Sequence, residues 1–307
     1  MRQPTTLLTL LLLVSVLVLC SSLAEPVHSF NLIRSVKKFS SKVGQKVKSK
    51  LDKIKSAVSL DKSMESNDRH LKTICSRDLE LASFLAKDSY DDKDSSGNDY
   101  KVVQFNKDKK TMTFSKIYFN EEKSTVVVAF RGTMKTSVRD WMNNLKIRKV
   151  KLSLNGKQLG KVHKGFLSTY LHDRKKIVSK VKQLIKEGKV KNLIFTGHSK
   201  GGATATLAAL DFATSAIKKD GIQSKLITFG QPRTGNSDFA KKVDNFVPEY
   251  ARVLSFFGNK KFDAVPIVPP KQLGYRHAGI DIQVKCGNKD RIKCHEITSY
   301  RLSISKL

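Results

Sequence analysis

Residues 193–210 read LIFTGHSKGGATATLAAL and place Ser199 between an apolar run and a run of small residues. The apolar run predicts a buried strand, and the small residues predict a helix packed closely behind it. Gly197 and Gly201 flank the serine in the G-x-S-x-G spacing of a nucleophile elbow. Glycine suits a tight, strained turn where a Cβ would collide with the crossing strand and helix. This stretch predicts a serine nucleophile at a strand-to-helix junction.

Helical and extended runs alternate on both sides of this junction. We expect extended segments at 101–104, 111–118, 125–130, 193–196, 226–229 and 252–256, and helices at 73–88, 174–187, 202–217 and 239–247. Such alternation is typical of an α/β fold with a mostly parallel central sheet flanked by helices. Because no internal repeat is visible, we predict a single domain over residues 70–307.

A serine hydroxyl becomes a nucleophile when a base takes its proton and an acid orients that base. In folds with this elbow, the order along the chain is serine, acid, histidine. Asp263 follows an extended run and precedes a proline-rich turn, so we expect it at the carboxyl ends of the strands. Two histidines follow Ser199, namely His277 and His295, and the residue pattern alone leaves the base open between them.

A series of ordered motifs resembles the class 3 lipases, the fungal-lipase-like branch of the α/β hydrolases. The resemblance covers roughly residues 70–305. It implies an acyl-ester hydrolase with Ser199, Asp263 and His295 as its triad, since the histidine of that family stands in the last segment. The motifs are FRGT at 130–133, RDWMNNL at 139–145, VHKGF at 162–166, GHSKGG at 197–202, TFGQPRTGN at 228–236, DAVPIVPP at 263–270 and YRHAG at 275–279.

The same resemblance implies two further parts of the site. The backbone N–H of Lys200 and Thr133 would hold the oxyanion, and residues 134–145, with the sole tryptophan Trp141, would form a hinged lid over the acyl pocket. Position 200 departs from the fungal pattern, where an apolar residue is usual. An ammonium beside the acyl site would favour anionic head groups over a neutral triglyceride.

Length and composition limit the remaining possibilities. A chain of 307 residues is long enough to bury a sizeable core, and its 17 Gly, 7 Pro and 4 Cys exclude collagen-like and disulfide-framework classes. Lys and Arg number 58 against 27 Asp and Glu, and this surplus draws the protein toward nucleic acid, anionic lipid or acidic polymers. No spacing suggests a metal site and no glycine-rich phosphate loop occurs, so we expect no cofactor.

The first 24 residues predict a secretory signal peptide, and hence a secreted protein. Arg2 precedes an apolar run at 7–20, and the small residues Ser22 and Ala24 fit a cleavage site before Glu25. The run is short for a membrane span, which disfavours an uncleaved anchor.

Residues 25–69 hold a predicted basic amphipathic helix and its linker. Between 30 and 60 the apolar residues recur at steps of three and four, and lysines fill the other side. Such a helix suits an anionic membrane surface, or a propeptide or strap packed on the main domain, and both interpretations stay open. Few aromatics accompany the lysines, which disfavours nucleic acid as a partner.

Export to an oxidising compartment favours disulfide formation. Cys75, Cys286 and Cys294 would remain in the mature chain, and three pairings are formally possible. We predict a Cys286–Cys294 bridge because these two bracket a short polar turn.

The sequence therefore predicts a secreted, monomeric serine hydrolase of the triacylglycerol lipase type, acting on lipid esters at an interface. Two alternatives stay open. One is a phospholipase acting on anionic membranes, and the other is a catalytically inactive, cationic membrane-binding protein.

Overall fold

The computed structural model describes residues 74–92, 99–133, 140, 142, 145, 147–215, 221–257 and 261–307, all within the unit Asn67–Leu307. The predicted signal peptide, basic helix and linker lie outside the described residues, as does most of the predicted lid, Trp141 included.

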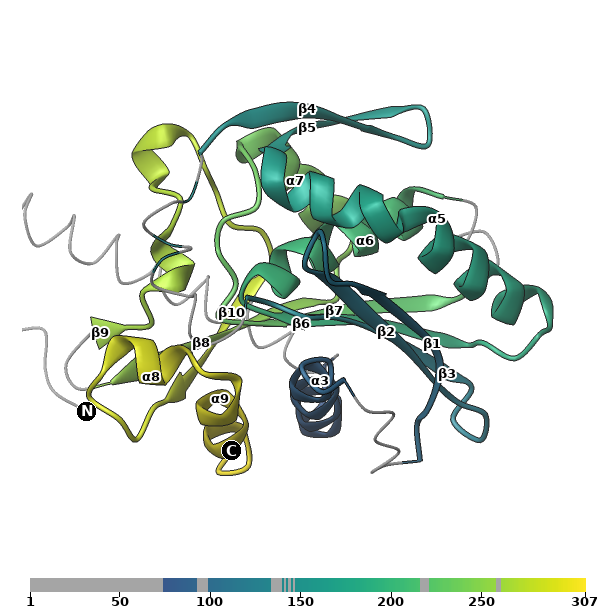
Figure 1. Ribbon diagram of the computed structural model, residues 1–307, viewed down its shortest axis with the longest axis horizontal. Coiled ribbons are helices and arrows are strands. Elements are labelled where there is room, and N and C mark those ends of the chain that lie inside the picture. The colour runs from purple at the N-terminus through teal and green to yellow at the C-terminus, as the bar shows by residue number, and fades with distance from the viewer. Residues whose placement is uncertain are drawn as a thin grey trace, which may run out of the picture. The chain divides into compact units, whose positions relative to one another are not determined.

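A central sheet organises the described part of the chain (Figure 1). Its strand order is β1-β2-β3-β6-β7-β8-β10, and the short β9 pairs with β8. Pairing is antiparallel from β1 to β3 and parallel from β3 to β10, which confirms the predicted mostly parallel sheet. The strands are β1 Lys101–Asp108, β2 Thr113–Asn120, β3 Thr125–Phe130, β6 Asn192–His198, β7 Gln223–Phe229, β8 Tyr250–Phe257, β9 Lys261–Phe262 and β10 Ile280–Lys285.

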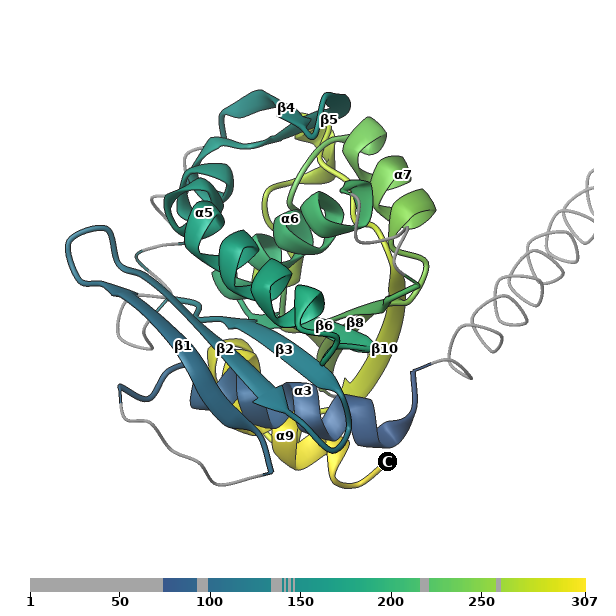
Figure 2. The ribbon, with the colours of Figure 1, turned by 90° about the vertical axis from the view of Figure 1, so that its right-hand side faces the viewer.

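Helices cover both faces of this sheet, as Figures 1 and 2 show. One face packs against α5 (Lys164–Lys186), α6 (Lys200–Thr214) and α7 (Ser237–Phe246), and the other against α3 (Ser76–Asp88) and α9 (Ile297–Ile304), with the short α8 (Arg291–His295) before α9. Strand β3 is buried along its whole length because neither face meets solvent. No helix among the described residues is long and apolar enough to cross a bilayer.

A hairpin, β4 (Lys149–Leu154) with β5 (Lys157–His163), was not predicted. The sequence carried its signal, because Asn155 and Gly156 separate two alternating runs. Both residues have positive φ, 51° and 73°, as a tight hairpin turn of this type requires. One face of the hairpin is buried in the helical layer through Leu152, Leu154, Leu159 and Val162.

Helix α5 starts ten residues earlier than predicted. The His163 Nδ1 atom accepts hydrogen bonds from the backbone N–H groups of Gly165 (3.1 Å) and Phe166 (3.3 Å). These bonds cap the helix N-terminus, where such donors have no partner within the helix. Histidine is an uncommon cap and Gly165 weakens the helical pattern, so this start is hard to predict from the residues alone.

Candidate active site

Ser199 occupies the sharp turn between β6 and α6. Its backbone has φ 57° and ψ −130°, a conformation that non-glycine residues rarely adopt. The Ser199 N–H donates to the Phe229 carbonyl at the end of β7 (2.9 Å), which ties the turn to the sheet. A Cβ at Gly201 would lie 2.1 Å from the Phe130 carbonyl oxygen. The strained serine and the obligatory glycine are what a nucleophile elbow needs.

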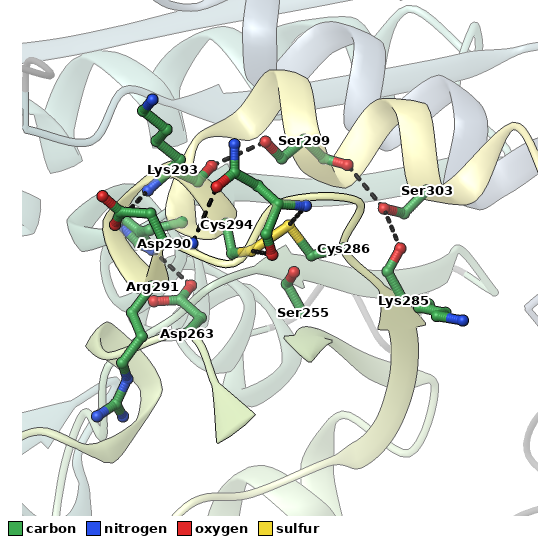
Figure 3. Close-up of a disulfide and its surroundings, with 12 residues drawn as sticks. Ser255, Asp263, Lys285, Cys286, Asp290, Arg291, Lys293, Cys294, Ser299 and Ser303 are labelled. Carbon is green, nitrogen blue, oxygen red and sulfur yellow. Dashed lines mark hydrogen bonds and ion pairs between the residues drawn. A yellow bond between two sulfur atoms is a disulfide. The ribbon is translucent and has the colours of Figure 1, made fainter. Parts of the chain in front are cut away.

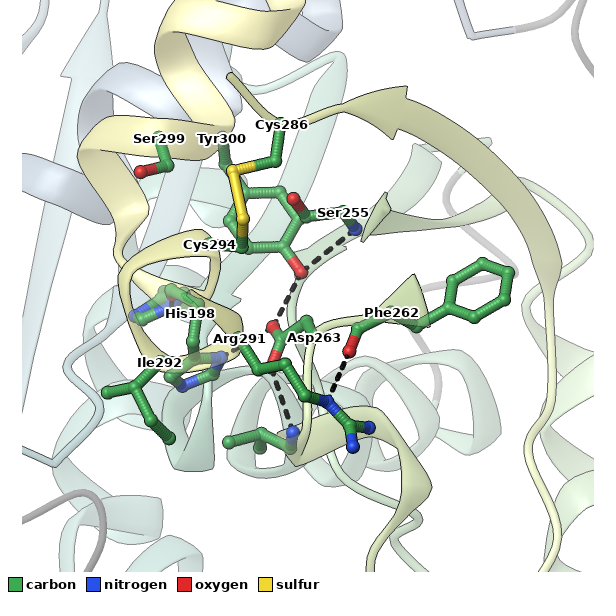
Figure 4. Close-up of polar contacts among 12 residues, drawn as sticks. His198, Ser255, Phe262, Asp263, Cys286, Arg291, Ile292, Cys294, Ser299 and Tyr300 are labelled. Carbon is green, nitrogen blue, oxygen red and sulfur yellow. Dashed lines mark hydrogen bonds and ion pairs between the residues drawn. A yellow bond between two sulfur atoms is a disulfide. The ribbon is translucent and has the colours of Figure 1, made fainter. Parts of the chain in front are cut away.

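Asp263 and His295 are joined in a buried pair. The His295 Nδ1 atom lies 2.6 Å from Asp263 Oδ2. The same oxygen accepts a hydrogen bond from the Tyr300 hydroxyl (2.8 Å; Figure 4). The other oxygen, Oδ1, accepts from the Val265 N–H (2.8 Å). Because a carboxylate only accepts, the hydrogen of His295 resides on Nδ1, and its Nε2 lone pair is left available to take a proton.

This pair meets the serine at the end of β7. A Cβ at Gly230, the residue after Phe229, would lie 2.8 Å from Asp263 Oδ2 and 2.9 Å from His295 Nδ1. The Ser199 Oγ and His295 Nε2 atoms are both buried, and neither has a hydrogen-bond partner among the described residues. The structure thus brings all three predicted residues to one place without a hydrogen bond between Ser199 and His295. Such bonds are often long in free enzymes and tighten in complexes.

His198 does more than pack in the core. Its Nε2 atom lies 2.5 Å from the His295 carbonyl oxygen, and its Nδ1 atom lies 2.8 Å from the Tyr90 hydroxyl. Since a carbonyl only accepts, Nε2 donates and Nδ1 accepts. Burial lowers the pKa of His198 well below its usual value, and the nearby His295 lowers that pKa further. A neutral His198 therefore holds the His295 backbone in place.

Tyr90 and Tyr300 were also missed by sequence reasoning. Tyr90 lies just after α3, and Tyr300 lies in α9, more than 30 positions after its partner Asp263. Burial is the main reason that the pKa of each phenol is raised above its usual value. Both hydroxyls therefore stay protonated and act as donors. No local pattern in the sequence marks a tyrosine for this task.

A disulfide holds the segment that carries His295 (Figure 3). It joins Cys286, just after β10, to Cys294 in α8, with their Cα atoms 5.8 Å apart. The N-cap Asp290 supports the same segment by accepting from the N–H groups of Ile292 (2.7 Å) and Lys293 (3.3 Å). Cys75 is exposed and forms no disulfide with a described residue.

His277 makes a loop contact and is not the histidine that pairs with Asp263. Its Nε2 atom donates to the Pro266 carbonyl (2.8 Å), on the loop that follows Asp263. Burial, followed by the charge of Arg252, lowers the pKa of His277 well below its usual value. Of the two histidines that the residue pattern left open, the structure puts His295 beside the carboxylate and uses His277 to hold a loop.

Both candidate oxyanion residues are next to the elbow. Lys200 is the first residue of α6, so its N–H is among those that a helix leaves without an internal acceptor. Thr133 follows Gly132, where an added Cβ would lie 3.1 Å from the Ser199 Cβ. Positive charge from the helix N-terminus also acts at this point.

Two cations lie beside the elbow. Lys200 donates to the Met112 carbonyl in the β1–β2 turn (3.3 Å), and the Arg131 guanidinium stacks on the Phe114 ring. Burial, and then the charge of Arg131, lower the pKa of Lys200. Arg131 contacts Asp92 at 3.5 Å, whereas no carboxylate in the described ranges pairs with Lys200. No group of described side chains has the composition of a metal site.

Comparison with known proteins shows which family the chain is similar to. The profile of the family "Lipase (class 3)" matches residues 127–273. The lipase of Rhizomucor miehei is 35% identical over 162 residues, which are 52% of this chain and 41% of that protein. Phospholipase A1-II 1 of Oryza sativa subsp. indica is 32% identical over 185 residues, 55% of this chain and 45% of the relative.

Solved structures agree with this lipase assignment. One described as a triacylglycerol lipase with a serine protease triad at its catalytic centre aligns with a TM-score of 0.59 and 29% identity. The alignment covers 68% of this chain and 79% of that one. Further relatives, 29% to 34% identical, are named secreted mono- and diacylglycerol lipases. The matched region spans less than half the length of the Rhizomucor and rice relatives. The predicted resemblance to class 3 lipases and the predicted α/β fold are confirmed.

Proposed function

We propose that this protein is a secreted serine hydrolase that cleaves the carboxylic esters of lipids. The observation that carries the proposal is the meeting of Ser199 with the Asp263–His295 pair at the end of β7, where a buried hydroxyl and a buried imidazole nitrogen both lack partners among the described residues. A base that is oriented by a carboxylate and lies near a strained serine is the arrangement used for acyl transfer.

Each residue then has a defined step. The Ser199 Oγ atom attacks the ester carbonyl while His295 Nε2 takes its proton, and Asp263 balances the charge of the imidazolium. The N–H of Lys200 and Thr133 stabilise the oxyanion. His295 returns the proton to the departing alcohol, leaving the acyl group on Ser199. Water, activated by the same imidazole, then releases the fatty acid.

The first test is the Ser199→Ala variant, assayed with a short p-nitrophenyl ester. We expect hydrolysis to fall by at least about 10³-fold, with an unchanged circular dichroism spectrum and melting temperature. Wild-type turnover in a folded variant would overturn the proposal, and would favour the catalytically inactive, membrane-binding alternative.

For the substrate we propose neutral acylglycerols first, with anionic phospholipids as the second candidate. The second is favoured by Lys200, whose ammonium lies next to Arg131 and has no carboxylate partner among the described residues. Turnover of a triglyceride and of an anionic phospholipid should be compared at equal interfacial area, with Lys200→Leu as the matched variant. If Lys200 selects the head group, the variant loses phospholipid turnover by about tenfold and keeps triglyceride turnover. Equal losses on both would remove the second candidate.

We further propose that residues 1–24 are a signal peptide, that 25–69 form a basic segment and that 70–307 are the hydrolase domain. Sequencing the N-terminus of the secreted protein tests the first boundary. A mature chain that begins at Glu25 is expected, and one that begins at Met1 would contradict export by this signal.

A further inference from the structure

Three large apolar side chains are exposed on two loops that touch each other. Ile147 precedes β4, and Ile267 and Leu273 lie on the segment between β9 and β10, with exposed fractions of 46%, 47% and 42%. The Tyr275 hydroxyl donates to the Ile147 carbonyl (2.9 Å), and Lys149 Nζ donates to the Leu273 carbonyl. We call Ile147, Ile267 and Leu273 the apolar rim. Isolated exposed apolar residues need no explanation, but a group on neighbouring loops marks an interaction site.

Bonds within the protein satisfy the carbonyl groups around the apolar rim. Arg233 donates to the carbonyls of Ile267 and Pro269, and His277 donates to that of Pro266. Arg276 donates to the Lys271 carbonyl (2.8 Å). Unsatisfied backbone groups are what normally keep irregular loops out of lipid. These loops can therefore present their side chains to hydrocarbon without exposing those carbonyls.

The surroundings of the apolar rim are positively charged and contain no acid in sequence. Residues 141–172 and 264–280 include no Asp or Glu. In the hairpin, Lys151 is directly opposite Lys161, a like-charge pair that destabilises a sheet. Arg148, Lys151, Lys161, Lys271 and Arg276 are exposed, and none forms an ion pair with a described residue.

This charge does not depend on the basic segment before the domain. From residue 74 to the end, Lys and Arg number 45 against 22 Asp and Glu. The apolar rim also lies close to the catalytic loop. Asp263 begins the segment that carries Ile267 and Leu273, and Figure 1 shows this segment rising from β9 to the end of the hairpin where β4 begins.

We propose that the apolar rim and the cations around it form a membrane anchor that inserts into the head-group boundary of an anionic lipid surface. Apolar side chains surrounded by Lys and Arg are what interfacial binding requires, since burial and attraction to anionic lipid add. The anchor orients the active site toward the lipid surface. It rests on the proposed lipid-ester hydrolysis only for its biological role, not for the binding itself. Binding is measurable without turnover, so the two proposals fail separately.

A site-specific probe tests insertion in the proposed mature chain, which begins at Glu25. The background carries Ser199→Ala, to prevent hydrolysis, and Cys75→Ser, so that the label reacts only with the introduced cysteine. Leu273→Cys is then labelled with the polarity-sensitive fluorophore NBD. The matched control is Leu302→Cys, because Leu302 is 65% exposed but lies in α9, on the other face of the sheet (Figure 1).

The label at 273 should shift to the blue and brighten with phosphatidylserine–phosphatidylcholine vesicles, and little with phosphatidylcholine alone. The label at 302 should stay unchanged. Equal responses at 302 and 273 would overturn the proposal. The proposal would also be overturned if the protein sedimented with vesicles while the fluorescence of the label at 273 stayed unchanged. Residues 25–69 would then be the part that binds the membrane. An equal response at 273 to soluble polyaspartate would identify an acidic polymer, not a membrane, as the partner.

A pair of charge variants tests the orientation. Lys151→Gln with Lys271→Gln removes two charges beside the apolar rim, and Lys175→Gln with Lys176→Gln removes two exposed charges from α5. We expect the first variant to weaken vesicle binding by about tenfold or more, and the second by much less. Equal losses from the two variants would mean that net charge alone drives binding, and would overturn an oriented anchor.

Discussion

Ser199 is held mainly by its own strand, turn and helix, whereas His295 is held by partners from three separate parts of the chain. The elbow has two tertiary contacts of note, the hydrogen bond from the Ser199 N–H to the Phe229 carbonyl and the approach of Gly201 to the Phe130 carbonyl. The imidazole depends on Asp263, on the carbonyl contact from His198 and on the disulfide next to it. A nucleophile can thus be encoded locally, while its base must be assembled by the fold. Substitutions at the elbow should therefore lower activity and stability through local strain. Substitutions around His295 should lower activity by removing the contacts that position the imidazole.

The largest effect should come from removing the base itself. His295→Ala leaves Ser199 without a proton acceptor, so kcat/KM for an ester should fall by about 10⁴-fold. His277→Ala removes only a loop contact to the Pro266 carbonyl and should lower kcat/KM by less than about tenfold. Steady-state kinetics on both variants checks this. If His277→Ala alone abolished turnover, the assignment of His295 would be wrong.

A substitution at Gly201 tests whether close local packing holds the elbow. Gly201→Ala places a methyl group 2.1 Å from the Phe130 carbonyl oxygen, so strand β3 and helix α6 must separate. We expect the free energy of unfolding to fall by about 3 kcal/mol, with loss of turnover. Gly287→Ala is the control, because no atom lies within 4 Å of the Cβ it would add. Urea denaturation compares the two, and equal stabilities would contradict a strained elbow.

Removing the disulfide tests whether contacts from distant parts of the chain hold His295 in place. Cys286→Ser with Cys294→Ser opens a loop with a sequence separation of 8, which by chain entropy should cost about 2.5 kcal/mol of unfolding free energy. Because Cys294 precedes His295, kcat should fall as well. The rate at which a fluorophosphonate labels Ser199 should fall more than the folded fraction of the protein does. Urea denaturation measures the stability, and labelling kinetics measure the reactivity of Ser199. Unchanged kcat in the double variant would show that α8 holds His295 without the bridge.

The same contrast explains what the sequence could predict. The elbow, the parallel sheet and the position of Asp263 after a strand follow from local patterns, because strand, turn and helix periods are written in adjacent residues. The roles of Tyr300 and His198 depend on contacts across 37 and 97 positions. No period or spacing records such contacts. The base was chosen by resemblance to a family, since His277 and His295 were equivalent in pattern.

The β4–β5 hairpin is a different kind of omission. Its turn residues and alternation were present in the sequence, but no strand or helix was predicted for residues 149–163. Its outer face carries lysines and its inner face carries leucine and valine, so the strand period is plain once the turn at Asn155 is recognised. This signal could have been used, whereas the tyrosine and histidine contacts could not.

The smallest predicted effect on turnover concerns the hydrogen bond from His198 to the His295 carbonyl. His198→Gln keeps an amide donor for the His295 carbonyl, whereas His198→Ala loses it, so we expect kcat to differ by about fivefold between the two variants. Steady-state rates at pH 8 measure this difference. Equal rates would mean that the bond does not position His295.

The pKa of His198 also sets the sign of a stability change. Burial keeps this pKa below the unfolded value of about 6.5, so below that pH the unfolded chain binds a proton that the folded chain does not. The free energy of unfolding should therefore fall as the pH drops, by about 1 kcal/mol between pH 6.5 and pH 5.5 from this residue. His198→Gln lacks this contribution, whereas His277, whose pKa is lowered in the same direction, contributes equally in both proteins. The difference between their urea midpoints over this range isolates His198, and parallel curves would show that its imidazole takes up a proton in the folded state.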